Sequence, residues 1–77
     1  MGETTGSLLK QARHANNLTV RKLREKLLVE HRLSLSEQTI RNWEIDRTAI
    51  PVKHLRVMAA ALGLNGPDEL VPSLDGE

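Results

Sequence analysis

Hydrophobic residues recur at intervals of three and four positions along most of the chain, which is the spacing of one face of an α-helix. In the first such segment Thr5 or Ser7 is a suitable N-cap, and Asn16-Asn17 ends the helix because Asn tolerates the left-handed conformation. The apolar stripe of this segment consists of Leu8, Leu9, Ala12 and Ala15. The pattern therefore predicts an amphipathic helix near the N-terminus.

The same periodicity predicts two further helices. Thr19 is a suitable N-cap for a second helix, whose apolar stripe consists of Val20, Leu23, Leu27 and Leu28. Ser34 or Ser36 caps a third helix in the segment SLSEQTIRNWE, residues 34–44. Ile40 and Trp43 share one side of that helix, so we expect both in the core.

Ile50-Pro51 marks the start of a fourth helix, because Pro is favoured at the first helical position. Gly63 closes this helix as a left-handed cap, and its apolar stripe consists of Leu55, Met58, Ala59 and Leu62. Residues 66–71 are predicted to form one short final helix, and we expect the residues from Ser73 onward to be frayed. The fold class is therefore all-α, a compact bundle of about five short helices. We expect one domain over residues 1–77 with an ordered core of about 5–72.

Composition narrows the possible functions. A chain of 77 residues makes one small domain, whose core is too small to enclose a deep substrate cavity. There is no Cys, so disulfides, thiolate metal sites and thiol nucleophiles are excluded, and the three His residues show no ligand spacing. No apolar run approaches membrane-spanning length. We therefore expect no enzyme, no metal, no cofactor and no membrane partner.

Charge is distributed unevenly along the chain. All eleven Lys and Arg residues lie between Lys10 and Arg56, where five acidic residues accompany them, so this stretch carries a net charge of +6. The remaining five acidic residues give the two ends a net charge of −5. A basic centre suggests a polyanionic partner, although a solvated mixed surface explains the charge alone equally well.

Four stretches together resemble the Cro and phage-repressor type of helix-turn-helix, also called the xenobiotic-response-element (XRE) family. They are LLKQARHANNLTVRKLREKL, LSEQTIRNWE, HLRVMAAALGL and PDELV, and they occur in the order typical of that family. The resemblance implies a lambda-repressor-like fold and a transcriptional regulator of the repressor type that binds double-stranded DNA. It also implies that the recognition helix, at about 36–45, lies in the major groove.

The resemblance assigns roles to individual residues. Base contacts are expected from the side chains that face outward on the third helix, Glu37, Gln38, Arg41 and Asn42. Phosphate contacts are expected from residues at or near helix ends, Thr19, Arg21, Lys22, Arg32, Ser36 and Thr39. Each outward side chain on the third helix could instead only keep that surface hydrated, and Glu37 could pair with Arg41 one turn away.

Arg13 and Glu44 occupy positions at which the family pairs an Arg of the first helix with the acid that ends the recognition helix. The resemblance therefore implies a partly buried ion pair between them. Such a pair would fix the angle of the recognition helix. The alternative is two unrelated surface charges.

Two features depart from the family pattern. Val20 stands where the family usually has a Gln that reaches a phosphate. The turn before the recognition helix is also longer by about six residues, 28–33. We expect the second helix to continue by about one turn, and Leu33 and Leu35 to point back into the core. His31 and Arg32 could touch a phosphate or only hydrate the loop.

Other functions and partners are compatible with these patterns. The segment TIRNWE followed by Ile50-Pro51 also resembles the MerR or excisionase type of winged helix-turn-helix. The same fold could serve as a protein-interaction module, such as an antitoxin or anti-repressor. We expect a homodimer in the cytoplasm of a bacterial or phage-infected cell, because one helix in one groove contacts few bases. An apolar edge for the dimer contact is offered by Leu70, Val71 and Leu74.

Overall fold

The computed structural model describes residues 3–72, which form four α-helices and one short 3-10 helix. The elements are α1 (Thr5–Ala15), α2 (Val20–His31), α3 (Glu37–Glu44), α4 (Val52–Ala61) and η1 (Pro67–Leu70). No strand occurs in this part of the chain. The predicted all-α class is confirmed, with the last of the five elements a 3-10 turn rather than an α-helix.

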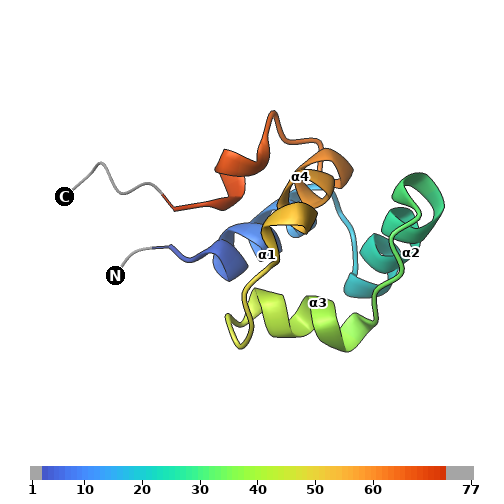
Figure 1. The fold of residues 1–77 in the computed structure, drawn as a ribbon, viewed down its shortest axis with the longest axis horizontal. Helices are drawn as coiled ribbons and strands as arrows, with labels where there is room; N and C mark the ends of the chain where they lie inside the picture. The colour runs from blue at the N-terminus through green and yellow to red at the C-terminus, as the bar shows by residue number, and fades with distance from the viewer. Residues whose placement is uncertain (1–2, 73–77) are drawn as a thin grey trace.

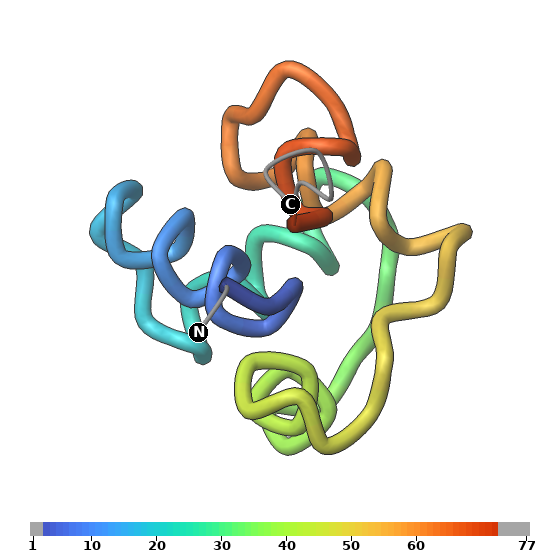
Figure 2. Tube along the Cα trace, turned by 90° about the vertical axis from the view of Figure 1, so that its left-hand side faces the viewer, coloured from blue at the N-terminus to red at the C-terminus, as the bar shows by residue number. Residues whose placement is uncertain are grey.

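The helices surround a single core (Figure 1). α1 and α4 lie in the middle, α2 forms one end of the molecule, and η1 packs against α1 and α4. α3 runs along the lower side in Figure 1, and Figure 2 shows it nearly end-on below the other elements. One long side of α3 therefore has no other described element against it. None of the helices within residues 3–72 is long and apolar enough to cross a membrane.

Side-chain caps begin the first three helices. The N-caps are Thr4, Thr19 and Ser36, and each hydroxyl oxygen accepts a hydrogen bond of 3.1 Å from the backbone N–H three residues later. The caps of α2 and α3 are as predicted. The expectation that Thr5 or Ser7 caps α1 was wrong, because Thr4 has the extended backbone that an N-cap needs and its hydroxyl bonds to the Ser7 N–H.

Left-handed residues end the helices. Asn17 (φ 57°) follows α1 and Gly63 (φ 72°) follows α4, as predicted. α2 continues to His31, which confirms its expected extension, and ends at Arg32 with φ 55°. The N–H of Leu33 then bonds back to the Leu27 carbonyl at 3.0 Å, which turns the chain toward α3.

The core is aliphatic apart from Trp43, which is 4% exposed. Its most completely buried large side chains are Leu9, Leu23, Leu27, Ile40, Met58 and Leu70. Leu33 and Leu35 pack against this core, as expected. Leu28 was placed on the core stripe of its helix but is 45% exposed, because Leu27, one residue earlier, takes the inward position. Ala15 is also exposed.

The burial of Leu70 corrects the predicted dimer edge. Leu70 is fully buried, because η1 folds back onto α1 and α4 and places this side chain between them. It therefore cannot contact a second copy of the chain. Val71 is 48% exposed, and Leu74 lies outside the described residues.

α1 and α3 come into close contact at Gly6, which is buried in the first turn of α1. A Cβ atom at this position would lie 2.3 Å from the Trp43 carbonyl oxygen and 2.7 Å from that of Glu44. Both oxygens are backbone atoms at the end of α3, so they cannot move aside without moving the helix. Glycine at position 6 thus permits this contact between the helices.

Replacement of Gly6 by Ala should therefore destabilise the protein, although Ala normally stabilises a helix by about 1 kcal/mol relative to Gly. We expect Gly6→Ala to lower the free energy of unfolding by about 1–3 kcal/mol, the usual cost of overpacking. Urea denaturation measures the change. The control is His14→Ala, an exposed position on the same helix, which should change stability by less than about 0.5 kcal/mol. Equal stability of Gly6→Ala and the wild type would contradict the close contact.

Candidate nucleic-acid interface

The polar side of α3 carries four hydrogen-bonding side chains. Gln38 and Arg41 are exposed, and Glu37 and Asn42 are half-buried at the base of the same side. The opposite side of the helix carries Ile40 and Trp43, which are buried. The structure therefore brings the four candidate base-contacting residues together on one face. Neither amide is packed inside the protein.

Hydrogen bonds link these four side chains in two pairs, each one helical turn apart. The Gln38 amide nitrogen Nε2 donates to Asn42 Oδ1 at 3.0 Å. The Arg41 guanidinium nitrogen Nη2 donates to Glu37 Oε1 at 3.3 Å. The face of α3 thus carries one neutral amide pair and one ion pair. The pairing of Glu37 with Arg41 was one of the alternatives left open by the sequence.

The N-terminus of α2 lies beside α3. Val20, the first residue of α2, lines an open groove together with Gln38 and Arg41 of α3. The caps Thr19 and Ser36 therefore begin two neighbouring helices, and the first N–H groups of both helices have no partner within their own helix. Positive helix ends and free N–H donors are favourable for anions such as phosphate.

The candidate phosphate-contacting residues are divided by the structure. Arg21 and Lys22 are exposed in the first turn of α2, close to α3. Thr39 is half-buried, and its hydroxyl lies 2.9 Å from that of the cap Ser36. Arg32 ends α2 and is separated from Thr19 by the length of that helix, roughly 18 Å at 1.5 Å per residue. The structure does not bring Arg32 into this group.

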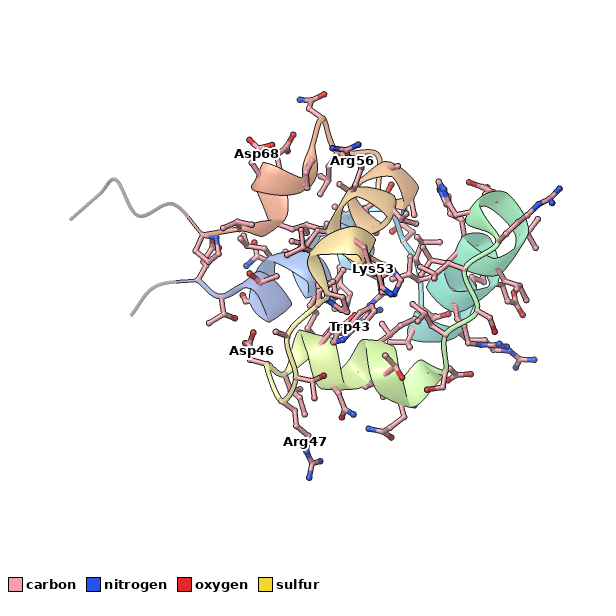
Figure 3. The ribbon with its side chains drawn as sticks, in the orientation of Figure 1. Trp43, Asp46, Arg47, Lys53, Arg56 and Asp68 are labelled. Carbon is pink, nitrogen blue, oxygen red and sulfur yellow. The ribbon has the colours of Figure 1, made fainter. Side chains whose placement is uncertain are left out.

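Two basic residues near α3 were missed by the sequence analysis. Lys10 of α1 lines the same groove as Gln38 and Arg41. Arg47, in the turn after α3, points away from the body of the protein below the end of that helix (Figure 3). Both were counted in the basic centre, but their positions depend on how α1 crosses α3 and how the chain leaves α3. Periodicity alone does not show either feature.

Arg13 and Glu44 form a buried ion pair with two hydrogen bonds. Arg13 Nε and Nη2 donate to the two carboxylate oxygens of Glu44 at 2.6 and 3.0 Å. The two side chains are 9% and 6% exposed. Arg13 Nη1 also donates to the carbonyl of Leu18 at 2.8 Å, in the connection before α2. One guanidinium therefore joins α1, the start of α2 and the end of α3.

A second contact holds α1 and α3 together. Asp46 follows α3 in the left-handed conformation (φ 60°), and its Oδ1 accepts a hydrogen bond of 3.0 Å from the Gly6 N–H. Its Oδ2 accepts from the hydroxyl of Thr4. The carboxylate thus satisfies a free N–H at the positive end of α1. Asp46 was not predicted as a structural residue, because its partners lie forty residues earlier.

No protein-family model, curated protein or solved structure matches the chain. Among the residues that the structure describes, no group of three His, Asp or Glu side chains is placed to hold a metal ion. The outer side of α3 and the adjoining start of α2 combine hydrogen-bonding side chains with exposed basic residues.

The buried ion pair leads to a test by a double-mutant cycle. Arg13→Met or Glu44→Leu alone leaves one buried charge without its partner, which should cost about 3–5 kcal/mol of unfolding free energy. The double variant should be more stable than the sum of the two losses predicts. Chemical denaturation of all four proteins gives the coupling energy.

The exposed pair Arg21–Glu25 is the matched control. Arg21 Nε lies 3.7 Å from Glu25 Oε2, and the two side chains are 73% and 55% exposed. Arg21→Met and Glu25→Leu should therefore show a coupling energy below about 1 kcal/mol. A coupling for Arg13 and Glu44 as small as that of the control would contradict the structural role given to the buried pair.

Proposed function

We propose that this protein is a sequence-specific regulator of transcription that binds double-stranded DNA, as a Cro-like helix-turn-helix repressor would. In this proposal α2 and α3 form the helix-turn-helix, and α3 is the recognition helix. The observation that carries the proposal is the outer side of α3, which bears four hydrogen-bonding side chains, two exposed and two half-buried. In Figure 1 no other described element packs against this side of the helix.

The size and shape of this surface suit the major groove of DNA. An α-helix with its side chains is about 10–12 Å across, and the major groove is about 12 Å wide. Glu, Gln, Arg and Asn are the side chains whose donors and acceptors match base edges in that groove. Ile40 and Trp43 support the proposal from the other side, because their burial holds α3 against the core while its polar side approaches DNA.

Positive charge and free N–H groups surround α3 on the same side. Arg21 and Lys22 stand in the first turn of α2, Lys10 lines the groove beside α3, and Arg47 lies in the turn after that helix. Phosphate groups on either side of the groove would meet these residues and the capped helix ends. Val20 is 8% exposed, so it contributes apolar contact with the core rather than a phosphate contact.

Affinity for duplex DNA should fall steeply with salt concentration. Each neutralised phosphate contributes a slope of about −0.9 to the plot of log affinity against log salt. Fluorescence anisotropy with a labelled duplex of random sequence measures this slope between low and physiological salt. A complex whose affinity does not change over this range would contradict the proposed electrostatic interface.

Two exposed arginines test on which side of the protein the DNA-binding charge lies. In Figure 3 Arg47 extends from the α3 side, whereas Arg56 of α4 lies on the opposite side of the protein. Arg47→Ala should weaken binding to all sequences and reduce the magnitude of the salt slope by about one. Arg56→Ala removes the same charge and should leave the slope unchanged. Equal effects of the two substitutions would place the DNA elsewhere.

We also propose that the protein binds DNA as a homodimer, because a single helix in one groove buries little surface and contacts few base pairs. Footprinting on the DNA that flanks the gene should then protect a site with two-fold symmetry. Its half-sites should be separated by about one helical turn, roughly 34–36 Å. Protection of one unrepeated segment would contradict the dimer while keeping DNA binding.

A protein-interaction module, such as an antitoxin or anti-repressor, is the second candidate. Ile45 and Val52 are 65% and 84% exposed on either side of the turn after α3, and such apolar residues can contact another protein. The winged helix-turn-helix alternative has no support, because its wing requires a β-hairpin and residues 3–72 contain no strand.

A further inference from the structure

The two side-chain pairs on α3 share one arrangement. In each pair the hydrogen-bond donor is the exposed partner and the acceptor is the half-buried partner. Gln38 donates to the half-buried Asn42, and Arg41, 56% exposed, donates to Glu37, 34% exposed. The donors therefore extend furthest toward solvent, while each acceptor holds its donor from below.

From this arrangement we infer that Gln38 and Arg41 contact the bases, and that Asn42 and Glu37 are positioning residues that hold these two side chains in place. The inference rests on the proposed function, and it reduces four candidate base-contacting residues to two. It also names the bases: an adenine for Gln38 and a guanine for Arg41.

The amide pair leaves Gln38 suited to adenine. Nε2 of Gln38 carries two hydrogens, of which one is donated to Asn42, so one N–H and the oxygen Oε1 remain for a base. Adenine offers the complementary pattern in the major groove, with N7 as acceptor and the N6 amino group as donor. The oxygen of Asn42 already accepts from Gln38, and its half-buried side chain lies further from an approaching duplex.

The ion pair holds the Arg41 guanidinium in a similar way and leaves it suited to guanine. One guanidinium nitrogen is held by Glu37, which leaves the other N–H donors for the two acceptors of guanine, O6 and N7. Glu37 is thereby a partner of Arg41 rather than an acceptor for cytosine. Gln38 and Arg41 are three residues apart, a rise of about 4.5 Å along a helix axis, compared with about 3.4 Å between successive base pairs. We therefore expect adenine and guanine at neighbouring positions of one half-site.

The experiment is selection of binding sites from a random duplex library, followed by affinity measurements on all four base pairs at each selected position. Gln38→Ala should remove the preference for A·T at one position, by roughly tenfold or more. Asn42→Ala should weaken the preference at that same position by about two- to tenfold, the effect of one lost hydrogen bond. The double variant should show little further loss.

Conservative variants distinguish positioning from direct contact. Asn42→Asp keeps the acceptor for Gln38, so it should lower affinity for every sequence through its added charge while the A·T preference remains. Glu37→Ala should weaken the G·C preference at the position that Arg41→Ala removes, and Glu37→Gln should retain most of it. Thermal unfolding of each variant checks that the fold is intact.

The outcomes distinguish a positioning role from a direct base contact, and both from a failure of the proposed function. If Asn42→Ala or Glu37→Ala changes preference at a position of its own, that residue contacts a base and the inference is overturned while DNA binding stands. Additive losses in Gln38→Ala/Asn42→Ala would overturn it as well. A wild-type protein that enriches no sequence would remove both the proposed function and the inference.

Discussion

The orientation of α3 depends on the buried ion pair between Arg13 and Glu44. Removing two charges from water costs several kcal/mol for each, so such a pair persists only with good geometry and further hydrogen bonds. All three guanidinium nitrogens of Arg13 have acceptors here, two on Glu44 and one at the Leu18 carbonyl. Because Leu18 directly precedes the cap of α2, this one side chain links the start of α2 to the C-terminal end of α3.

α3 is only eight residues long, so little of its stability comes from its own hydrogen bonds. Tertiary contacts hold it instead: Ile40 and Trp43 pack inward, Asp46 bonds to the start of α1, and the Trp43 ring lies 6.1 Å from that of His54 on α4. These contacts use one side and the C-terminal end of the helix. Its other side is left for polar side chains that contribute nothing to the core.

The sequence predicts those parts of the structure that depend on nearby residues. Thr19, Ser36 and Gly63 end or begin helices through hydrogen bonds and backbone angles within a few positions, and each was predicted correctly. Leu70 was not, because its burial depends on η1 folding across α1 and α4. The same reason applies to Lys10 in the α3 groove, which only the packing of α1 places there.

The candidate site likewise combines features that nearby residues determine with features that only tertiary packing determines. Its residues on α3 follow from helical spacing around Ile40 and Trp43, so the sequence identifies the face. Spacing also allows one-turn pairs, but it does not say which partner is the more exposed. That difference between Gln38 and Asn42 arises from how deeply α3 sits against its neighbours, and only the fold determines it.

The connection between α2 and α3 is compact because it begins in a left-handed turn. α2 ends at Arg32, and this turn brings the chain straight back to Leu33 and Leu35, which pack against the core. The last turn of α2 lies on the solvent side of this connection, with Val29 77% exposed. A change in chain length at this end of α2 would therefore fall on exposed side chains rather than on the core.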